Sequence, residues 1–399
     1  MNIAQINQPY DRLDDEEVIL HNALDGDGQV MYRKDRPYND LPLLPPAGVE
    51  LENREILKAC IRAHAALAEL KQAGKRIPNQ TVLINTIPLL EAQGSSEIEN
   101  IVTTSDELFK LAALQSERDT DPETKEAYRY RTALQHGYRE IRRRPLTAKM
   151  ALEMCQILRD EKITLRQNPG VHIRNTASKE VVYTPPEGEG VLRQKLANWE
   201  QFMNNFKEVD PLVRLAVGHY QFEAIHPFDD GNGRTGRILN ILFLLKERLL
   251  EIPVLYLSRY IVDLKRIYYD RIRGVTEEGN WQPWILFMVN AVTDTAMWTC
   301  AKIEAIADLM LETKHYLRDS LPKIYSHELN DVLFQQPYCR ISDLVESKIA
   351  KRQTASVYLK SLCDIGILEE RTIGRDKLFI HPKFLRLLCA DEHGFEKYA

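Results

Sequence analysis

The sequence contains no apolar run long enough to cross a lipid bilayer. A membrane-spanning helix needs about 20 consecutive apolar residues, and the longest apolar stretch, residues 238–245, ends at Lys246, Glu247 and Arg248. The first 20 residues carry Asp and Glu where a signal peptide would have an apolar segment. We therefore expect a cytoplasmic protein without membrane contact.

Cysteine pairs and a strong net charge are also missing. None of the six cysteines forms a Cys-x-x-Cys pair, so a zinc site built from such pairs is not expected. Thiols scattered in this way are typical of a reducing compartment. The formal net charge of −5 implies no general attraction to nucleic acid or to an anionic membrane. The cysteines are Cys60, Cys155, Cys300, Cys339, Cys363 and Cys389.

The composition is that of a globular protein that can bury a large core. Of the 399 residues, 44% are hydrophobic and 28% are charged, and the length allows two or three domains. Apolar residues recur at helical spacing over most of the chain up to about residue 318. One segment differs: Val181, Val182 and Tyr183 favour a strand, and prolines and glycines follow them, so we expect a short exposed hairpin within residues 170–190. The predicted helices cover residues 51–73, 105–114, 125–142, 147–159, 191–206, 212–225 and 234–250, and another ends near residue 100.

The segment of residues 226–237, HPFDDGNGRTGR, concentrates residues that can carry chemistry. Gly231 and Gly233 allow the backbone to turn tightly and approach a ligand. A predicted helix follows at once, and the free N–H groups of a helix start bind anions, most often phosphate. Arg234 and Arg237 oppose the helix dipole there, which makes sense if they meet phosphate oxygens.

Two further side chains of this segment suit the same chemistry. The Asp230 carboxylate would repel phosphate unless a divalent cation lay between them, and Mg²⁺ is bound by few carboxylates together with phosphate oxygens. His226 titrates near neutrality and can act as a general base. The alternative is a plain Gly-Asn-Gly turn with surface charges. It is disfavoured because His, Asp, Asn and two Arg converge within twelve positions.

The segment resembles the Fic motif, His-x-Phe-x-Asp/Glu-Gly-Asn-Gly-Arg-x-x-Arg, at every fixed position. The resemblance implies an all-α core with a short β-hairpin flap and a transfer of AMP from ATP to a hydroxyl of a protein target, with self-modification among the reactions. By matching positions, His226 would deprotonate the target hydroxyl and Phe228 would anchor the loop. Asp230 would hold Mg²⁺, and Arg237 would reach the terminal phosphates of ATP. The other positions expected to bind the nucleotide are Gly231, Asn232, Gly233, Arg234, Thr235 and Gly236.

Gly233 bears on the group that is transferred. Relatives called Doc carry Lys at this position and phosphorylate their targets, so Gly233 favours AMP transfer. Transfer from another donor stays open. A DNA-binding regulator whose Fic domain only senses nucleotide is also left open.

A second short motif resembles the inhibitory helix motif of Fic proteins, Ser/Thr-x-x-x-Glu-Gly/Asn. It is formed by Ser95, Glu99 and Asn100. Ser95 and Glu99 are four residues apart and share one helix face. The resemblance implies that Glu99 pairs with Arg237, inhibits the enzyme, and belongs to a brake on the N-terminal side of the catalytic loop. The alternative is a helix cap with an exposed carboxylate, and removal of AMP from targets by Glu99 is left open.

The flap and an aromatic pair complete the expected site. The hairpin with Val182 and Tyr183 lies where Fic proteins place the flap, and an exposed strand edge can pair with an extended target. Tyr268 and Tyr269 match an aromatic pair of which one lines the adenine site in relatives. Core packing is an equal alternative for both tyrosines, and an ordinary surface hairpin is the alternative for the flap.

The C-terminal part has the pattern of a winged helix. Two helices, residues 341–349 and 354–363, precede two strands, residues 367–372 and 377–381. Basic and acidic residues alternate there, so DNA binding, protein docking and dimerisation all stay open. The basic residues are Lys348, Lys351, Arg352, Lys360, Arg371, Arg375 and Lys377, and the acidic ones Asp343, Glu346, Glu369, Glu370 and Asp376. The predicted division is an arm (1–47), an N-terminal helical region with the inhibitory helix (48–120), the Fic catalytic domain (121–319) and the winged helix (320–399).

Overall fold

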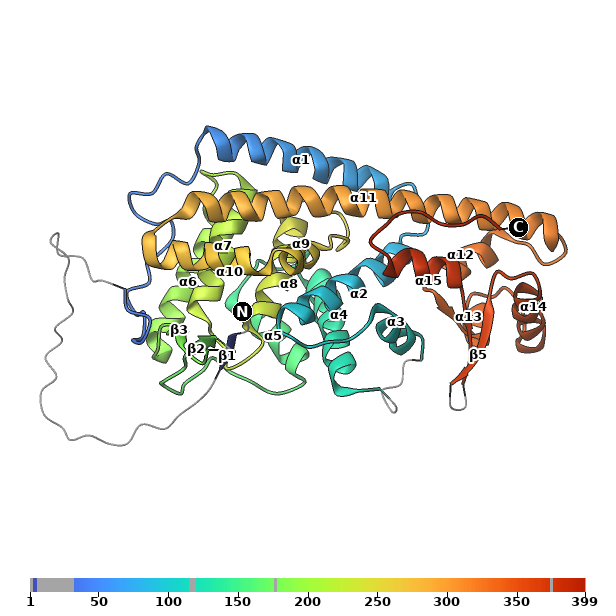
Figure 1. The fold of residues 1–399 in the computed structure, drawn as a ribbon, viewed down its shortest axis with the longest axis horizontal. Helices are drawn as coiled ribbons and strands as arrows, with labels where there is room; N and C mark the ends of the chain where they lie inside the picture. The colour runs from blue at the N-terminus through green and yellow to red at the C-terminus, as the bar shows by residue number, and fades with distance from the viewer. Residues whose placement is uncertain (1–2, 6–31, 115–119, 176–177, 374–375, 399) are drawn as a thin grey trace, which may run out of the picture.

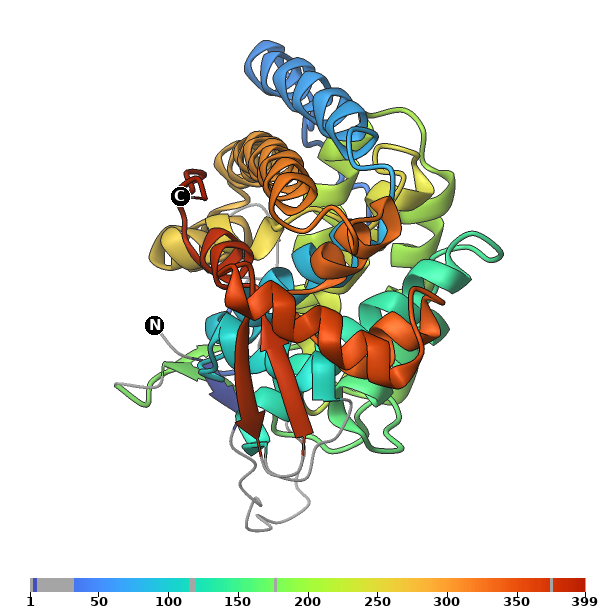
Figure 2. The same ribbon diagram turned by 90° about the vertical axis from the view of Figure 1, so that its right-hand side faces the viewer.

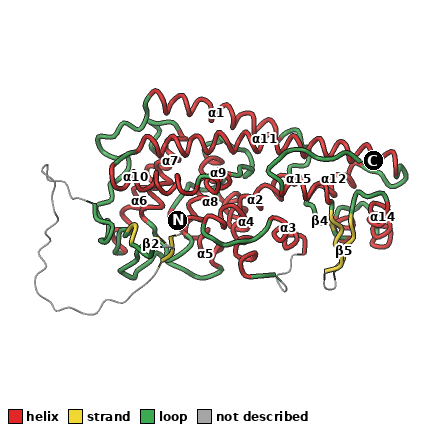
Figure 3. The backbone as a smooth tube through the Cα atoms, in the orientation of Figure 1, coloured by secondary structure: helices red, strands yellow, loops and turns green. Residues whose placement is uncertain are grey.

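The computed structural model describes residues 3–5, 32–114, 120–175, 178–373 and 376–398. Helices dominate this part of the chain, and its strands lie in two small sheets (Figure 3). The predicted all-α class with a flap and a winged helix is confirmed. The helices are α1 (Arg54–Gly74), α2 (Thr81–Ile98), α3 (Ser105–Leu114), α4 (Pro122–Glu140), α5 (Ala148–Arg159), α6 (Glu189–Asn205), α7 (Pro211–Ile225), α8 (Asn232–Lys246), α9 (Leu257–Asp263), α10 (Lys265–Glu278), α11 (Trp281–Ser320), α12 (His327–Gln335), α13 (Ile341–Glu346), α14 (Arg352–Asp364) and α15 (Pro382–Cys389). The strands are β1 (Ile3–Gln5), β2 (Ile173–Asn175), β3 (Val181–Tyr183), β4 (Tyr338–Cys339), β5 (Glu369–Ile373) and β6 (Asp376–Ile380).

Helices α7 and α8 form the centre of the core. Thirteen of the fifteen residues of α7 and twelve of the fifteen of α8 are buried, including polar side chains such as Arg214, Arg237 and Asn240. The start of α7 is fixed by its cap: Asp210 accepts a hydrogen bond from the N–H of Leu212, and Pro211 occupies the first helical position. The loop between the two helices therefore rests on a rigid base.

One long helix, α11, packs against helices from both the N-terminal and the C-terminal parts of the chain. Helix α11 has 40 residues and lies beside α1 along one side of the molecule (Figure 1). It runs through the predicted border at residues 319–320 and ends at Ser320. The helix is shared by the two parts of the chain, because it packs against α1 and α7 at one end and against α12 and α15 at the other.

The C-terminal module has the predicted order of helix, helix and wing, with additions. Its sheet has the order β4-β6-β5 (Figure 2). The sequence prediction missed α12, β4 and α15. On the wing, Lys377 lies 2.5 Å from Glu370, and Arg371 lies 3.9 Å from Glu369, so basic charges there sit beside carboxylates. Arg375 lies outside the described residues.

A buried lysine fastens the last helix to α11. The Lys302 ammonium donates hydrogen bonds to the backbone oxygens of Leu387, Ala390 and Glu392, at 2.7, 2.8 and 2.9 Å. The lysine is fully buried in the protein. Its three donors therefore satisfy carbonyl groups in the last turn of α15 and directly after it.

Replacing Lys302 with methionine should destabilise the C-terminal module by about 2–4 kcal/mol, because buried carbonyl groups lose their donor. Urea unfolding, with hydrogen exchange of residues 382–398, would measure this. Lys323→Met, at an exposed position just beyond α11, is the matched control. Equal unfolding midpoints for the two variants would contradict the role of Lys302.

The described part of the arm is hydrogen-bonded to the flap region and to α6. In its described part, Tyr38 N–H donates to Thr184 O at 3.1 Å, and Asn198 exchanges hydrogen bonds with the backbone of Leu44. Strand β1 pairs with β2, which pairs with β3. One edge of the flap is thus covered by the chain itself, whereas the prediction had an open hairpin. Residues 6–31 of the arm lie outside the described residues.

None of the described helices is both long and apolar enough to cross a membrane.

Candidate active site

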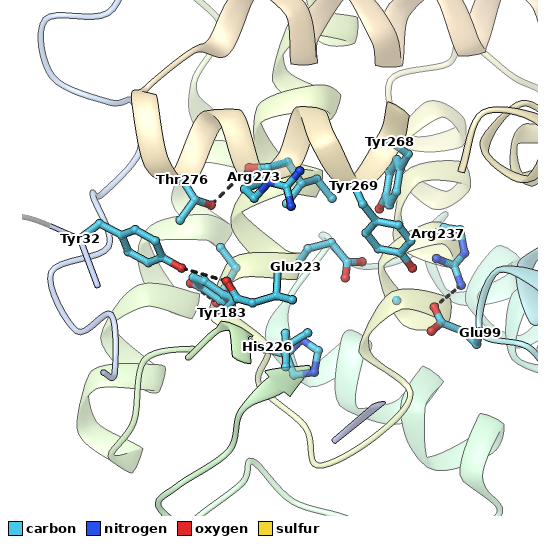
Figure 4. A pocket seen from close by; sticks show the side chains of 15 residues that line it. Tyr32, Glu99, Tyr183, Glu223, His226, Arg237, Tyr268, Tyr269, Arg273 and Thr276 are labelled. Atoms are coloured by element: carbon cyan, nitrogen blue, oxygen red, sulfur yellow. Dashed lines mark hydrogen bonds and ion pairs between the residues drawn. The ribbon is translucent and has the colours of Figure 1, made fainter. Parts of the chain in front are cut away.

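One cavity of about 970 Å³, part of which is open to solvent, is lined by eight of the predicted site residues (Figure 4). They are Glu99, Val182, Tyr183, His226, Gly233, Arg237, Tyr268 and Tyr269, whereas Asp230, Gly231, Asn232, Arg234, Ser95 and Asn100 are not in its lining. Its walls are the ends of α2 and α7, the start of α8, one face of α10, and the flap. One end of the cavity is polar, with Glu99, His226, Gly233 and Arg237. The other end is largely apolar, and the lining there includes Ile173, Val182, Tyr183, Ala224 and Ile272.

His226 ends α7 in a left-handed conformation, with φ 49° and ψ 59°. This conformation is uncommon for a residue with a side chain. Arg166 holds the turn, because its Nε donates to the His226 carbonyl oxygen at 2.7 Å and its backbone N–H donates to Pro227 O. Enclosure by protein, and then the Arg166 charge, lower the pKa of His226 from 6.5 to about 4; a hydrogen bond with the Glu223 backbone acts in the opposite direction. The imidazole is therefore neutral at pH 7, the form that can accept a proton.

The shifted pKa gives a direct test on the free protein. Lowering the pKa extends the neutral form to lower pH, so the His226 signal in a histidine NMR titration should stay constant from pH 8 to about 5.5. His64 serves as the internal control, because hydrogen bonding to Asp210 raises its pKa. Its signal should titrate above the ordinary value of 6.5. A His226 midpoint between pH 6 and 7 would contradict the described environment.

The loop after His226 is shaped by Asn232 and Phe228. The Asn232 amide accepts from Phe228 N–H at 2.9 Å and donates to Phe228 O at 2.7 Å, while the Phe228 ring is buried against Phe222. Both ends of the Asn232 amide are thus used to close the loop. The predicted phosphate contact of Asn232 would come from its backbone N–H, the first of α8, and its side chain acts on the shape of the loop.

Helix α8 begins two residues earlier than predicted, at Asn232. The N–H groups at its start have no partner within the helix and are the anion-binding groups that the sequence suggested. Gly233 lies in the first turn, and a Cβ there would stand 2.2 Å from Glu99 Oε1. The glycine is therefore required for the close approach of Glu99. Thr235, which is buried, and Gly236 lie beneath the loop and line no part of the cavity.

The charged groups of the loop are bound by two residues that the sequence analysis did not identify. Arg234 Nη1 donates to Glu126 Oε1 at 2.7 Å, and Arg159 Nη1 lies 2.5 Å from Asp230 Oδ2. Glu126 is on α4 and Arg159 ends α5. No local pattern could have identified them, since they are 108 and 71 residues away from their partners along the chain.

Asp230 is the residue predicted to hold Mg²⁺, and its surroundings fit that role. The carboxylate is 57% exposed, beside the start of α8. Among the described residues no three His, Cys, Asp or Glu side chains gather as a metal site. A single carboxylate suits Mg²⁺, which completes its shell with phosphate oxygens and water. Asp230 would have to exchange its contact with Arg159 for the ion.

Arg237 is held by two of the three predicted residues of the inhibitory motif. Its Nε donates to Ser95 Oγ at 2.8 Å and its Nη2 donates to Ser95 O at 2.8 Å. Its Nη2 also donates to Glu99 Oε1 at 2.7 Å (Figure 4). The guanidinium is 1% exposed. Glu99 caps the end of α2, and Asn100 follows in a left-handed conformation, with its amide oxygen 3.2 Å from Lys265 Nζ. In this arrangement the guanidinium faces a carboxylate where a phosphate would lie.

Ser95 should contribute less to this arrangement than Glu99, because it supplies one neutral side-chain acceptor. Loss of such a hydrogen bond costs about 1 kcal/mol, so Ser95→Ala should raise the rate of label transfer from ATP about fivefold. The neighbouring Ser96 is the matched control. It is buried, and its hydroxyl has no hydrogen-bond partner in the described structure. An equal response to Ser96→Ala would argue against a specific role for Ser95.

The tyrosine pair and the flap line the other side of the cavity. Tyr268 is buried and its hydroxyl lies 2.9 Å from His219 Nε2, so it packs in the core and also lines the cavity. Tyr269 packs edge to face on Tyr268. In the flap, Tyr183 donates from its hydroxyl to Ala224 O at 2.8 Å. Tyr268 therefore packs in the core and borders the cavity, and its contact with the adenine base stays a prediction.

Family models match three successive parts of the chain. They are the Fic/DOC family N-terminal model over residues 57–139, the Fic/DOC family model over 145–244, and the protein adenylyltransferase SoFic-like C-terminal domain over 309–384. The chain therefore carries Fic/DOC family domains and a C-terminal domain of the SoFic-like kind.

Curated relatives are named as protein adenylyltransferases. The chain is 28% identical over 148 residues to protein adenylyltransferase Fic of Aedes aegypti, which covers 36% of this chain and 28% of that protein. It is 32% identical over 118 residues to protein adenylyltransferase fic-1 of Caenorhabditis briggsae, covering 29% of this chain and 22% of that protein. The matched part is thus less than a third of each relative.

Solved structures of Fic proteins are also similar. A Fic family protein from Desulfovibrio desulfuricans has a TM-score of 0.45 at 19% identity, over 81% of this chain and 95% of that chain. Fic-1 from C. elegans has a TM-score of 0.47 at 18% identity, over 63% and 73%.

Proposed function

We propose that the chain is a protein adenylyltransferase that moves AMP from ATP to a hydroxyl group of a protein, itself included, and that Glu99 inhibits it. The observation that carries this proposal is the convergence of three groups on one cavity. These are the neutral His226, the N–H groups at the start of α8, and the buried Arg237. The names of the curated relatives support it.

The geometry supports a transfer by direct attack. The triphosphate would lie on the start of α8, with Arg234 and, once Glu99 has moved, Arg237 neutralising its charge. His226 accepts the proton of the target hydroxyl, whose oxygen forms a bond to the α-phosphorus. The bond from the α-phosphorus to the bridging oxygen breaks and pyrophosphate leaves. Catalysis is then mainly positioning and charge stabilisation.

Mg²⁺ on Asp230 would supply further positive charge to the phosphates. The protein target would present its backbone along β3, whose residues Val182 and Tyr183 border the cavity, because β1 covers the other side of the flap.

Two labels on ATP test the reaction type. In Glu99→Gly, label in the α-phosphate should appear on protein, while label in the γ-phosphate should not. Transfer of the γ-label would make the chain a kinase. No transfer from ATP, but transfer from another nucleotide donor, would replace AMP as the transferred group. DNA binding and dimerisation have no support in the findings above and are not part of this proposal.

A further inference from the structure

The carboxyl group of Glu223 is a half-buried polar group that the proposed mechanism does not use. It lines the cavity from α7, one helical turn before His226. Its Oε1 is shielded from solvent and has no hydrogen-bond partner among the described residues. Buried polar atoms are nearly always paired, so a carboxyl group without a hydrogen-bond partner among the described residues, at the wall of a binding cavity, calls for an explanation.

The neighbouring cations are committed to other groups. Arg237 is held by Ser95 and Glu99, and Arg273 donates to Asp270 Oδ1 at 2.6 Å. Burial raises the pKa of Glu223 to about 8, with the Arg237 charge acting against this shift. The described side chains around the cavity therefore leave this carboxyl group without a hydrogen-bond partner.

The glycine at position 236 provides space for the Glu223 carboxyl group. A Cβ at Gly236 would stand 2.4 Å from Glu223 Oε1, so glycine is the residue that lets the carboxyl group sit there. Gly236 itself does not line the cavity. Its lack of a side chain matters because it leaves space for the Glu223 carboxyl group. The carboxyl group is thus built into the floor of the cavity.

The polar and apolar ends of the cavity indicate where Glu223 lies relative to a bound nucleotide. The α-phosphate must lie near His226 and the start of α8, and the base suits the apolar end formed by Val182, Tyr183 and Ile272. The ribose joins these two parts. In Figure 4 the Glu223 carboxyl group lies between these ends, near Tyr269 and above His226. Neighbouring turns of one helix place side chains about 5–6 Å apart, which is the scale of a sugar ring.

We propose that Glu223 accepts hydrogen bonds from the ribose hydroxyl groups of the bound nucleotide and thereby selects ribonucleotides over deoxyribonucleotides. This inference rests on the proposed function, because it takes ATP as the occupant of the cavity. A carboxyl group accepts hydrogen bonds at its oxygens whether or not it carries a proton, and a ribose offers two adjacent hydroxyl donors. A site built to bind a hydroxyl rejects the analogue without it, since its polar group is left unpaired.

Binding measurements separate this inference from the activity. The affinities of ATP, 2′-deoxy-ATP and 3′-deoxy-ATP would be measured by calorimetry with Mg²⁺ on the full chain carrying Glu99→Gly and His226→Ala, which prevents turnover. We expect ATP to bind at least about tenfold more tightly than one of the deoxy analogues. Adding Glu223→Leu should reduce this ratio to within about twofold, mainly by weakening ATP. Glu223→Gln, which keeps one acceptor, should retain part of the preference.

The control is Glu278→Leu, at an exposed position on α10, which should leave the ratio unchanged. If the parent does not distinguish the three nucleotides, or if Glu223→Leu and Glu223→Gln both keep the full ratio, the role of Glu223 is refuted. The α-label assay on Glu99→Gly reports on the activity separately. Ribose selection without transfer would refute the proposed function alone, and transfer without ribose selection would refute the role of Glu223 alone.

Discussion

Replacing Glu99 with glycine should raise the rate of AMP transfer from ATP by about 10- to 100-fold. The carboxylate lies 2.7 Å from the Arg237 guanidinium, which is almost fully buried. A hydrogen bond between charged groups contributes roughly 1.5–3 kcal/mol, and this free energy must be overcome before a phosphate can take the place of Glu99. The change also empties the space above Gly233, where Glu99 now lies. Initial rates with α-labelled ATP at saturating target or self-modification would measure the effect.

The structure offers a close control for this variant. Glu97→Gly makes the same substitution two residues earlier, at an exposed side chain near the end of α2, and should leave the rate unchanged. Arg237→Ala combined with Glu99→Gly should lose most of the gain, because the group that Glu99 releases is then missing. Equal rates for wild type and Glu99→Gly, with nucleotide bound in both, would refute the inhibitory role.

His226→Ala in the Glu99→Gly background should reduce AMP transfer by about 10²- to 10⁴-fold, the usual contribution of a positioned general base. The affinity for ATP should change by no more than about twofold, because the expected phosphate contacts come from α8 and its arginines. The turn itself depends on the backbone of residue 226, which Arg166 holds through the carbonyl oxygen. Alanine keeps this carbonyl group, so the loop should persist.

Calorimetry of ATP binding and thermal unfolding would establish that the His226→Ala variant is folded and binds nucleotide. A parallel His136→Ala variant, at a position that is 43% exposed in its side chain, controls for the loss of an imidazole elsewhere. Undiminished transfer by His226→Ala would remove the general-base assignment and leave the loop as a nucleotide-binding element only.

The parts of the site that were predictable are those encoded in one short segment. Glycines beside Asn232, a helix start and two arginines define an anion site by local rules alone. The pairing of Glu99 with Arg237 was inferred from a resemblance. The structure brings these residues together, but the inhibitory role itself stays a prediction. The Asn232 side chain closes the loop because an amide has both a donor and an acceptor, and the backbone of Phe228 offers the matching pair. The contact of Asn232 with phosphate stays a prediction.

Other parts depend on long-range packing, which local patterns do not record. Glu126, Arg159 and Glu223 carry no motif, and each acquires its role from the helix that packs opposite it. The domain border near residue 320 fell inside α11 because the change in sequence character there marks the end of a helix, and this helix is shared by both modules. Likewise, β1 covers one edge of the flap by pairing with β2, which lies about 170 residues further along the chain.

A structure of the Glu99→Gly variant with Mg²⁺ and a non-hydrolysable ATP analogue is the most direct test of the site as a whole. We predict that the terminal phosphate contacts Arg237 in the volume that Glu99 vacates, and that the α-phosphorus faces the imidazole of His226 across the start of α8. A nucleotide bound away from this loop, or one whose α-phosphate lies out of reach of His226, would contradict the account.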